Sequence, residues 1–383
     1  MDLISEIKNK LSILELLSWL NLQPNGSGFI FSIYKDEKTP SLKIYPATNS
    51  YHCFATGKGG DVITFYQDFY RINTKTAVKE LAERLNISAV GLKESIPNKP
   101  KSLARIRKTF KPKYSLLKSE KEIFEERVGI ILEDTTIKVE TAKNIAYSYI
   151  LHQRKLTQIK IFESLYKFNI SKGINEDIHR YLTGPKRGLT DETINKFKLF
   201  SINSVKENIE FLRDTFPKDE VLIAGLFKNK YFLFTKHRLI IPYIENERVV
   251  YLRGRYFYKG NFEPENFGKY IGLNNWSQTL SPKRFFNLDV LNRLVPFALL
   301  IITEGEFDCM VVIQSNYNAI GIPGVTNFPK DQVNLLQHYN VHLAFDNDAA
   351  GEKAVIEISE LFDKPVKVLK LKSHKDVTEL LNE

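Results

Sequence analysis

The strongest constraint on the fold is the alternation of short apolar runs with helical patterns over residues 290–383. The apolar runs have the length of buried strands, and amphipathic stretches stand between them. Such alternation predicts an α/β domain with a doubly wound parallel sheet. The predicted strands are 297–302, 319–322, 341–345 and 366–371, and the predicted helices are 308–315, 330–338 and 349–361.

Acidic residues follow three of these predicted strands. Glu304 and Asp308 come after the first, Asp346 and Asp348 after the third, and Asp376 after the fourth. In open α/β sheets the carboxyl ends of the strands form the ligand-binding edge, so we expect the five carboxylates to converge there. They would repel one another unless divalent cations neutralised them. Oxygen donors without His or Cys favour Mg²⁺ or Mn²⁺ over zinc.

Two other interpretations apply to the segment 346–357. An Asp-x-Asp pair in a loop is commonly a solvated turn. Gly351 and Glu357 also stand where a calcium-binding loop needs them, but Ala350 and Ala354 replace two ligand positions. A predicted strand, rather than a helix, precedes the segment, which disfavours the calcium loop.

The rest of the chain divides by pattern into three segments. Residues 1–97 combine amphipathic helices with short apolar runs at 29–33 and 42–45, which predicts a small α+β module. Residues 98–113 carry seven Lys or Arg, no acid and two prolines, as in a linker or arm. Residues 114–289 are helical in pattern at first and strand-like later, so we expect a mixed α/β subdomain before the α/β domain of residues 290–383.

Composition narrows the function classes. The formal net charge of +10 favours a polyanionic partner such as nucleic acid. Cys53 and Cys309 are the only cysteines, which excludes a disulfide framework and a zinc site of several thiolates and favours a reducing compartment. Charges interrupt the first twenty residues, and no apolar run approaches the roughly 20 residues of a membrane span. The absence of a GxxxxGK[ST] pattern argues against a motor ATPase.

The acidic motifs resemble a known family. Glu304-Gly305-x-x-Asp308, Asp346-x-Asp348-x-x-Gly351 and Lys375-Asp376 are similar to the Toprim domain, which topoisomerases, primases and some nucleases share. The resemblance implies that these acids bind the metals that govern phosphoryl or phosphodiester chemistry. It does not choose among the reactions.

Upstream motifs resemble bacterial primases over most of the chain. Residues 37–41 (EKTPS), 51–54 (YHCF) and 57–62 (GKGGDV) are similar to the zinc-binding module at the N-terminus of that family. Further landmarks resemble its catalytic core: Tyr181-Leu182, Arg187-Gly188-Leu189, Phe197, Ala224-Gly225-Leu226, Arg238, Ile241-Pro242, Gly254-Arg255 and Lys269-Tyr270.

The zinc-binding module departs from the family at its ligands. The family's zinc ligands fall at Ser32, Lys35, Cys53 and Thr56, of which Cys53 alone is a competent ligand. His52 does not rescue the site without two more donors. We therefore expect no structural zinc, and we expect apolar burial to hold the module together, through Ile33, Tyr34, Leu42, Ile44 and Phe54.

The resemblance implies a DNA primase that synthesises short RNA primers on a single-stranded DNA template. Glu304, Asp346 and Asp348 would be catalytic and would hold two metals that orient the nucleoside triphosphate, while Asp308 and Asp376 complete the metal cluster. Glu304 could instead accept the proton of the attacking hydroxyl, and the sequence leaves both roles open.

Nucleic-acid contacts follow from the same resemblance. Arg187, Arg238, Arg255 and Lys269 match family positions that line a basic groove for template and nucleotide phosphates, and Tyr270 would stack on a base. The expected partners are template, nucleoside triphosphates and the RNA–DNA primer hybrid. The arm at 98–113 either contacts nucleic acid or is a solvated linker.

Two rival functions stay open, a Toprim-type metal-dependent nuclease and a non-catalytic DNA-binding replication factor. The chain ends soon after the Toprim pattern, so we expect no counterpart of the helical module by which cellular primases dock on a replicative helicase. Either that helicase is recruited differently or none is needed. This brevity suggests a plasmid, phage or other mobile element, and we expect a cytoplasmic, nucleoid-associated protein without a membrane partner.

Overall fold

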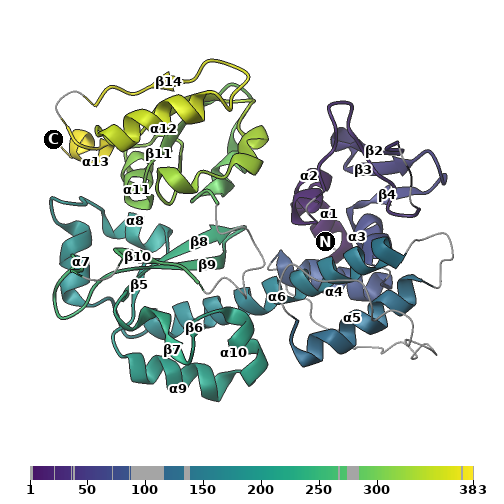
Figure 1. Ribbon diagram of the computed structural model, residues 1–383, viewed down its shortest axis with the longest axis horizontal. Coiled ribbons are helices and arrows are strands. Elements are labelled where there is room, and N and C mark those ends of the chain that lie inside the picture. The colour runs from purple at the N-terminus through teal and green to yellow at the C-terminus, as the bar shows by residue number, and fades with distance from the viewer. Residues whose placement is uncertain are drawn as a thin grey trace. The chain divides into compact units, whose positions relative to one another are not determined.

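The computed structural model describes residues 3–20, 22–35, 37, 39–70, 72–85, 87, 116–132, 139–265, 268–273, 284–371 and 374–382. The chain divides into two compact units, residues 1–156 and 157–383, with the boundary inside α6 (Val139–Ile170) (Figure 1). The predicted linker at 98–113 lies outside the described residues. None of the described helices has the length and apolar character needed to cross a bilayer.

The first unit contains an antiparallel sheet in the order β1-β2-β3-β4. The sheet and the helices share one hydrophobic core, which includes Leu42 of the sheet, Phe65 and Leu81 of the following helices, and Val128 and Ile150 further along the chain. Part of the predicted 114–289 segment therefore packs with the N-terminal module. The elements are α1 (Leu3–Lys10), α2 (Ile13–Trp19), β1 (Phe29–Ile30), β2 (Leu42–Tyr45), β3 (Ser50–Cys53), β4 (Gly59–Asp61), α3 (Val62–Tyr70), α4 (Thr74–Arg84) and α5 (Lys118–Ile131).

Local sequence explains where these helices begin. The Asp61 carboxylate accepts hydrogen bonds from the backbone N–H groups of Ile63 and Thr64, both at 3.0 Å, and so caps α3. Asn73 caps α4 in the same way through the Thr76 N–H at 2.9 Å. The buried residues of α3 recur at helical spacing and turn one apolar stripe to the core, namely Val62, Phe65, Tyr66 and Phe69.

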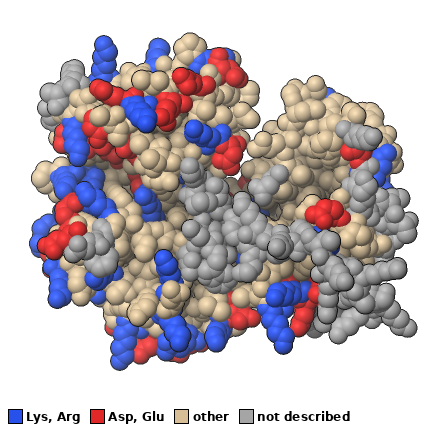
Figure 2. All heavy atoms as spheres, in the orientation of Figure 1, with Lys and Arg blue, Asp and Glu red and all other residues tan. Residues whose placement is uncertain are grey.

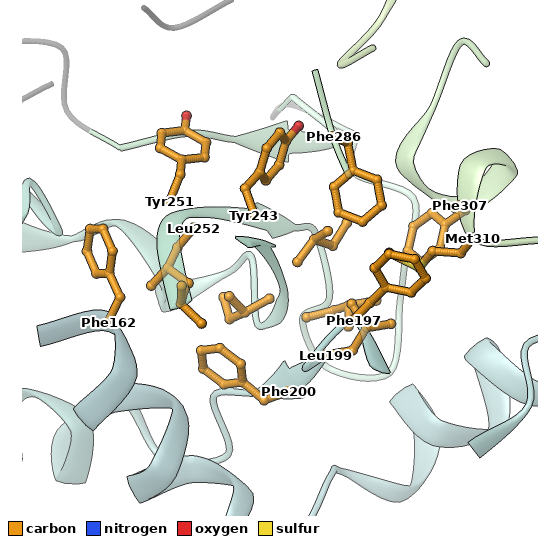
Figure 3. Packing of buried hydrophobic residues seen from close by; sticks show 14 of the residues in the cluster. Phe162, Phe197, Leu199, Phe200, Tyr243, Tyr251, Leu252, Phe286, Phe307 and Met310 are labelled. Atoms are coloured by element: carbon orange, nitrogen blue, oxygen red, sulfur yellow. The ribbon is translucent and has the colours of Figure 1, made fainter. Parts of the chain in front are cut away.

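The second unit begins with helices around an antiparallel sheet in the order β10-β9-β8-β5. Its core also includes Phe307 and Met310 of the later helix α11 (Glu306–Gln314), which belong to the same cluster as Phe197 and Leu199 and are labelled with them in Figure 3. The elements are α7 (Glu176–Thr183), α8 (Asp191–Lys196), β5 (Phe200–Ser201), α9 (Val205–Thr215), α10 (Lys218–Ala224), β6 (Phe227–Lys228), β7 (Tyr231–Phe232), β8 (Leu239–Glu245), β9 (Arg248–Arg255) and β10 (Tyr270–Ile271).

The C-terminal part of this unit confirms the predicted α/β domain. Its sheet is parallel, with the order β12-β11-β13-β14. One predicted helix is wrong in type, because Lys330–Leu335 forms a 3-10 helix. Val333 and the residue that follows this helix, Leu336, face the core. They are three residues apart, which matches one turn of a 3-10 helix. The elements are β11 (Leu299–Thr303), α11 (Glu306–Gln314), β12 (Ala319–Gly321), β13 (Asn340–Ala344), α12 (Ala349–Ser359), β14 (Lys367–Val368) and α13 (Val377–Leu381).

Candidate active site

The five predicted acidic residues lie where strands end and helices begin. Glu304 follows β11, Asp346 follows β13, and Asp308 is in the first turn of α11. Asp348 and Asp376 are the N-cap residues of α12 and α13. Strands β11 and β13 are parallel neighbours with Thr303 opposite Ala344, so Glu304 and Asp346 leave the sheet at the same edge.

Hydrogen bonds join the loops that carry these acids. The Asp346 N–H donates to a Glu304 carboxylate oxygen at 3.3 Å, which links the ends of β11 and β13. The Asn347 N–H donates to the Lys375 carbonyl at 2.7 Å. The Thr378 hydroxyl donates to Asp308 Oδ1 at 2.6 Å, which links α13 to α11. Hydrogen bonds between several elements thus hold the acidic cluster.

Glycine permits a close backbone approach inside the cluster. A Cβ atom added to Gly351 would lie 2.1 Å from the Asp346 carbonyl oxygen, much closer than any side chain tolerates. The first turn of α12 can therefore pack against the backbone of Asp346 because residue 351 has no side chain.

The carboxylates disturb one another's ionisation. Burial, with smaller repulsion from Glu304, Asp308, Asp376 and Asp348, raises the pKa of Asp346 to about 7. Burial, followed by repulsion from neighbouring carboxylates, also raises the pKa of Glu304 and of Asp308. Burial and, to a smaller extent, nearby negative charge therefore make full ionisation of the cluster unfavourable, and a bound cation would offset both effects.

The donor set fits a hard divalent cation, because it consists of carboxylate oxygens alone. Among the described residues, however, no three or more His, Cys, Asp or Glu side chains are already arranged to hold a metal ion. The pKa shifts show that the acids lie within electrostatic range of one another. The side chains would have to draw together around a cation.

Basic and aromatic residues gather beside the acidic cluster. The Arg187 guanidinium lies 4.3 Å from the ring centroid of Phe307 on α11, and its Nε donates to the Tyr181 hydroxyl at 2.9 Å. Arg255 lies 5.0 Å from the ring centroid of Tyr270, its partner across β9 and β10. An Arg255 nitrogen also donates to the Tyr181 hydroxyl, at 3.4 Å, so Tyr181 connects three of the five predicted nucleic-acid-binding residues, Arg187, Arg255 and Tyr270.

The other two predicted residues are held differently. Lys269 forms an ion pair with Glu263 at 2.9 Å, and Glu263 also contacts Arg255. Arg238 donates to the Thr235 carbonyl at 3.0 Å and lies 5.7 Å from the Tyr258 ring. Figure 2 shows Lys and Arg spread over the visible face of residues 157–383, with Asp and Glu among them.

Sequence reasoning missed a buried ion pair beside the site, between Arg253 and Glu306. Glu306 is 1% exposed and accepts hydrogen bonds from Arg253 and from the Tyr243 hydroxyl, the latter at 2.6 Å. Arg253 in turn lies 4.2 Å from the Tyr270 ring centroid. A signal existed for Arg253, which shares a strand face with Arg255 two residues on. For Glu306 the sequence offered only its position between two predicted ligands.

The residues at the expected zinc-ligand positions do not fit zinc. The Ser32 hydroxyl lies 3.4 Å and the Ser41 hydroxyl 3.6 Å from the sulfur of buried Cys53. The Glu37 carboxylate accepts hydrogen bonds from the Ser32 and Ser41 N–H groups, at 2.7 and 2.8 Å. Although burial raises the pKa of Cys53, hydrogen bonds with Ser32, Thr56 and Ser41 lower it overall.

Comparison with known families gives two matches. A CHC2 zinc finger model matches residues 1–95, and a Toprim-like model matches residues 301–381. The first match supports the predicted kind of module, and it counts in part against the expectation that zinc is absent. The second supports the use of a divalent metal without identifying the ion.

Curated relatives of the chain are DNA primases of bacteria. The chain is 25% identical over 378 residues to the DNA primase of Thermotoga maritima, which covers 96% of this chain and 56% of the relative. It is 26% identical over 396 residues to the DNA primase of Borreliella burgdorferi, which covers 99% and 65%. The chain thus spans less than two thirds of either relative.

A solved structure shares the fold. The zinc-binding and RNA polymerase domains of the Aquifex aeolicus primase match with a TM-score of 0.50 and 20% identity, over 100% of this chain and 82% of that one. At that identity the likeness concerns the fold alone. The two family models lie in the order and at the positions that the motifs predicted, and the relatives extend the match over nearly the whole chain. Together, the two family models, the relatives and the shared fold support the assignment of the chain as a relative of bacterial-type DNA primases.

Proposed function

We propose that this chain synthesises short RNA primers on single-stranded DNA by two-metal nucleotidyl transfer. The observation that carries the proposal is the acidic cluster at the carboxyl edge of β11 and β13, where Asp346 has a pKa of about 7. A site that disfavours its own charge so strongly is suited to bind divalent cations. Glu304, Asp346 and Asp348 would hold them, with Asp308 and Asp376 completing the set.

Bound Mg²⁺ or Mn²⁺ would stabilise the charge that develops on the phosphates during transfer. Residues of the chain would position the carboxylates that hold the metal ions. A hydrogen bond from the Asp346 N–H links Glu304 to the adjacent strand end, and Thr378 orients Asp308. Glu304 remains the candidate to accept the proton from the attacking hydroxyl, since its raised pKa brings it nearer to neutral pH.

Template, nucleoside triphosphates and the RNA–DNA hybrid would bind along the arginines of β9 and the neighbouring loops. Arg187, Arg238, Arg255 and Lys269 would neutralise phosphates, so affinity should fall as salt concentration rises. Tyr270 already contacts Arg253 and Arg255 through its ring, so stacking on a base would compete with these contacts. We also propose a nucleoid location and domain boundaries at residues 97, 113 and 289.

The decisive experiment is nucleotide incorporation on unprimed single-stranded DNA with Mg²⁺ or Mn²⁺. Wild type is compared with the Asp346→Asn, Asp348→Asn double variant, because asparagine can still cap α12. Short RNA products that disappear in the variant support the proposal. Metal-dependent cutting of the template without synthesis would favour the Toprim nuclease, and binding without either reaction would favour the replication factor.

We also propose that the N-terminal module folds without zinc. Cys53 is the only thiolate donor at the expected ligand positions. The Glu37 carboxylate accepts hydrogen bonds from the backbone N–H groups of both Ser32 and Ser41 and so connects the two segments that carry them. Purified protein should contain far less than one zinc per chain, and EDTA should leave the unfolding of this module unchanged. One equivalent of zinc by elemental analysis would overturn this part of the proposal and leave primer synthesis untouched.

A further inference from the structure

A tight hairpin turn follows β9 and presents two consecutive residues to the basic cluster. Tyr258 and Asn261 exchange backbone hydrogen bonds at 3.0 and 3.1 Å, with Lys259 and Gly260 at positive φ between them. The Asn261 side chain then accepts a hydrogen bond from the Glu263 N–H at 2.9 Å. The turn thereby fixes the direction in which Phe262 and Glu263 leave the hairpin.

Phe262 is stacked on an aromatic ring of the site. Its ring centroid lies 3.8 Å from that of Tyr181, and the two ring planes differ by 15°. The Tyr181 hydroxyl also accepts a hydrogen bond from Arg187. The ring of Tyr181 is therefore both held in place and covered by a flat apolar group.

Glu263 places one carboxylate among three cations. Its oxygens lie 2.9 Å from Lys269 Nζ, 3.3 Å from an Arg255 nitrogen and 3.7 Å from Lys186 Nζ. Arg255 is 2% exposed, and its buried Nε has no hydrogen-bond partner within the described parts of the chain. The hydrogen bond from Lys269 lowers the pKa of Glu263, so the carboxylate is charged at neutral pH.

A stacked ring beside an anion bound by several cations reproduces the chemistry of one nucleotide, with its base and its phosphate. We propose that Tyr181, Lys186, Arg255 and Lys269 form a subsite for one nucleotide unit of single-stranded nucleic acid, and that Phe262 and Glu263 occupy this subsite in the free protein. The inference rests on the proposed nucleic-acid function. Glu263 is half-exposed and its ion pairs are solvent-screened, so an incoming phosphate can displace it.

Single-stranded DNA binding tests this subsite without requiring synthesis. Anisotropy of a labelled oligothymidylate is measured over a range of salt for wild type, Glu263→Gln and Glu265→Gln. Glu265 is an exposed acid nearby that makes none of the three ion pairs, and its substitution changes the net charge equally. Glu263→Gln should bind severalfold more tightly than Glu265→Gln, with a log–log salt slope steeper by about 0.7, the value of one additional phosphate contact.

Phe262→Ala provides a second test. It uncovers the Tyr181 ring without changing the net charge, and it should also tighten binding of the oligothymidylate. Equal affinities and slopes for Glu263→Gln and Glu265→Gln would overturn the subsite, as would weaker binding by Glu263→Gln with unchanged thermal stability. If no variant, wild type included, binds the oligonucleotide, the proposed function itself fails. Thermal unfolding of each variant separates these outcomes from a loss of folded protein.

Discussion

Glu304 and Glu306 stand two residues apart and meet opposite surroundings. Glu306 is fully buried, but Arg253 and the Tyr243 hydroxyl satisfy its carboxylate. Glu304 is half-buried beside Asp346 and near Asp308 and Asp348, and burial raises its pKa. A carboxylate that is paired with a buried cation, such as Glu306, contributes to packing. A carboxylate that lies among other acids, such as Glu304, retains affinity for a metal cation.

Removal of the Glu306 carboxylate should destabilise the second unit strongly. Glu306→Ala leaves the largely buried Arg253 without its charge partner, and such losses cost about 3–5 kcal/mol. Urea unfolding of the variant measures this cost. The Arg253→Met, Glu306→Met double variant should unfold at a higher urea concentration than Glu306→Met alone; equal midpoints would argue against a coupled pair.

The sequence predicted the strand ends at which the acids lie, but it did not predict the ion pair between Arg253 and Glu306. Glu304 and Asp346 were predictable because parallel strands end at a common edge. Arg253 and Glu306 are 53 residues apart, and they meet because α11 packs on the core that β9 shares. Such a contact depends on tertiary packing, which local periodicity does not encode.

The stability of helix α3 should depend on pH, because the carboxylate of Asp61 caps it. Burial by itself raises the pKa of Asp61, but hydrogen bonds from Lys8 and from the Thr64 N–H outweigh it and leave the pKa below its usual value. A depressed pKa means that the ionised carboxylate stabilises the fold above the unfolded value near pH 4, and this contribution is lost as pH falls through the folded pKa.

Asp61→Asn should therefore lower the melting temperature at neutral pH while it retains the cap. The gap from wild type should narrow as pH falls below about 4, because wild type then loses its own charge. Melting curves of both proteins across this range provide the test. A gap that stays constant with pH would show that the charge of Asp61 contributes nothing.

Helix α12 depends on a missing side chain. Gly351→Ala places a Cβ against the Asp346 carbonyl, and overpacking of this kind costs about 1–3 kcal/mol. The substitution should also displace Asp346 and weaken the proposed primer synthesis. Gly26→Ala is a suitable control, because its added Cβ would meet no described atom within 4 Å apart from residue 26 and its chain neighbours. Chemical denaturation of both variants distinguishes a specific clash from a general effect of alanine.

Periodicity predicted many elements, with limits that have physical causes. The strand at Leu42–Tyr45 matches the prediction fully, since its residues alternate between buried and more exposed. Strands β3 and β4 were not predicted, because β3 mixes polar and aromatic residues and β4 is Gly59-Gly60-Asp61. Their pairing depends on the adjacent strand rather than on their own propensity.

For the whole molecule, the two units have separate cores and should respond separately to ligands. Mg²⁺ binding at the acidic cluster would stabilise the second unit by about 2.7 kcal/mol at one hundred times the dissociation constant. Hydrogen exchange should therefore slow at β11 and β13 but not at β2 and β3. The Asp346→Asn, Asp348→Asn variant should show no slowing, and equal slowing in this variant would place the metal elsewhere.

The boundary between the units could not be read from the sequence. It lies inside the 32-residue helix α6, which has a continuous helical pattern and no Pro or Gly to mark a break. Ile150 contributes to one core and Phe162 to the other. A change of packing partner along one helix leaves no signal in local periodicity.

Two of the acids serve a second purpose. Asp348 caps α12 through the N–H groups of Ala350 and Gly351, and Asp376 caps α13 through the Glu379 N–H. In a lineage that had given up catalysis, selection for folding would still favour a capping residue at both positions. Glu304 and Asp346 have no such capping duty in the described structure, so drift at these two positions would be the earlier sign of lost chemistry.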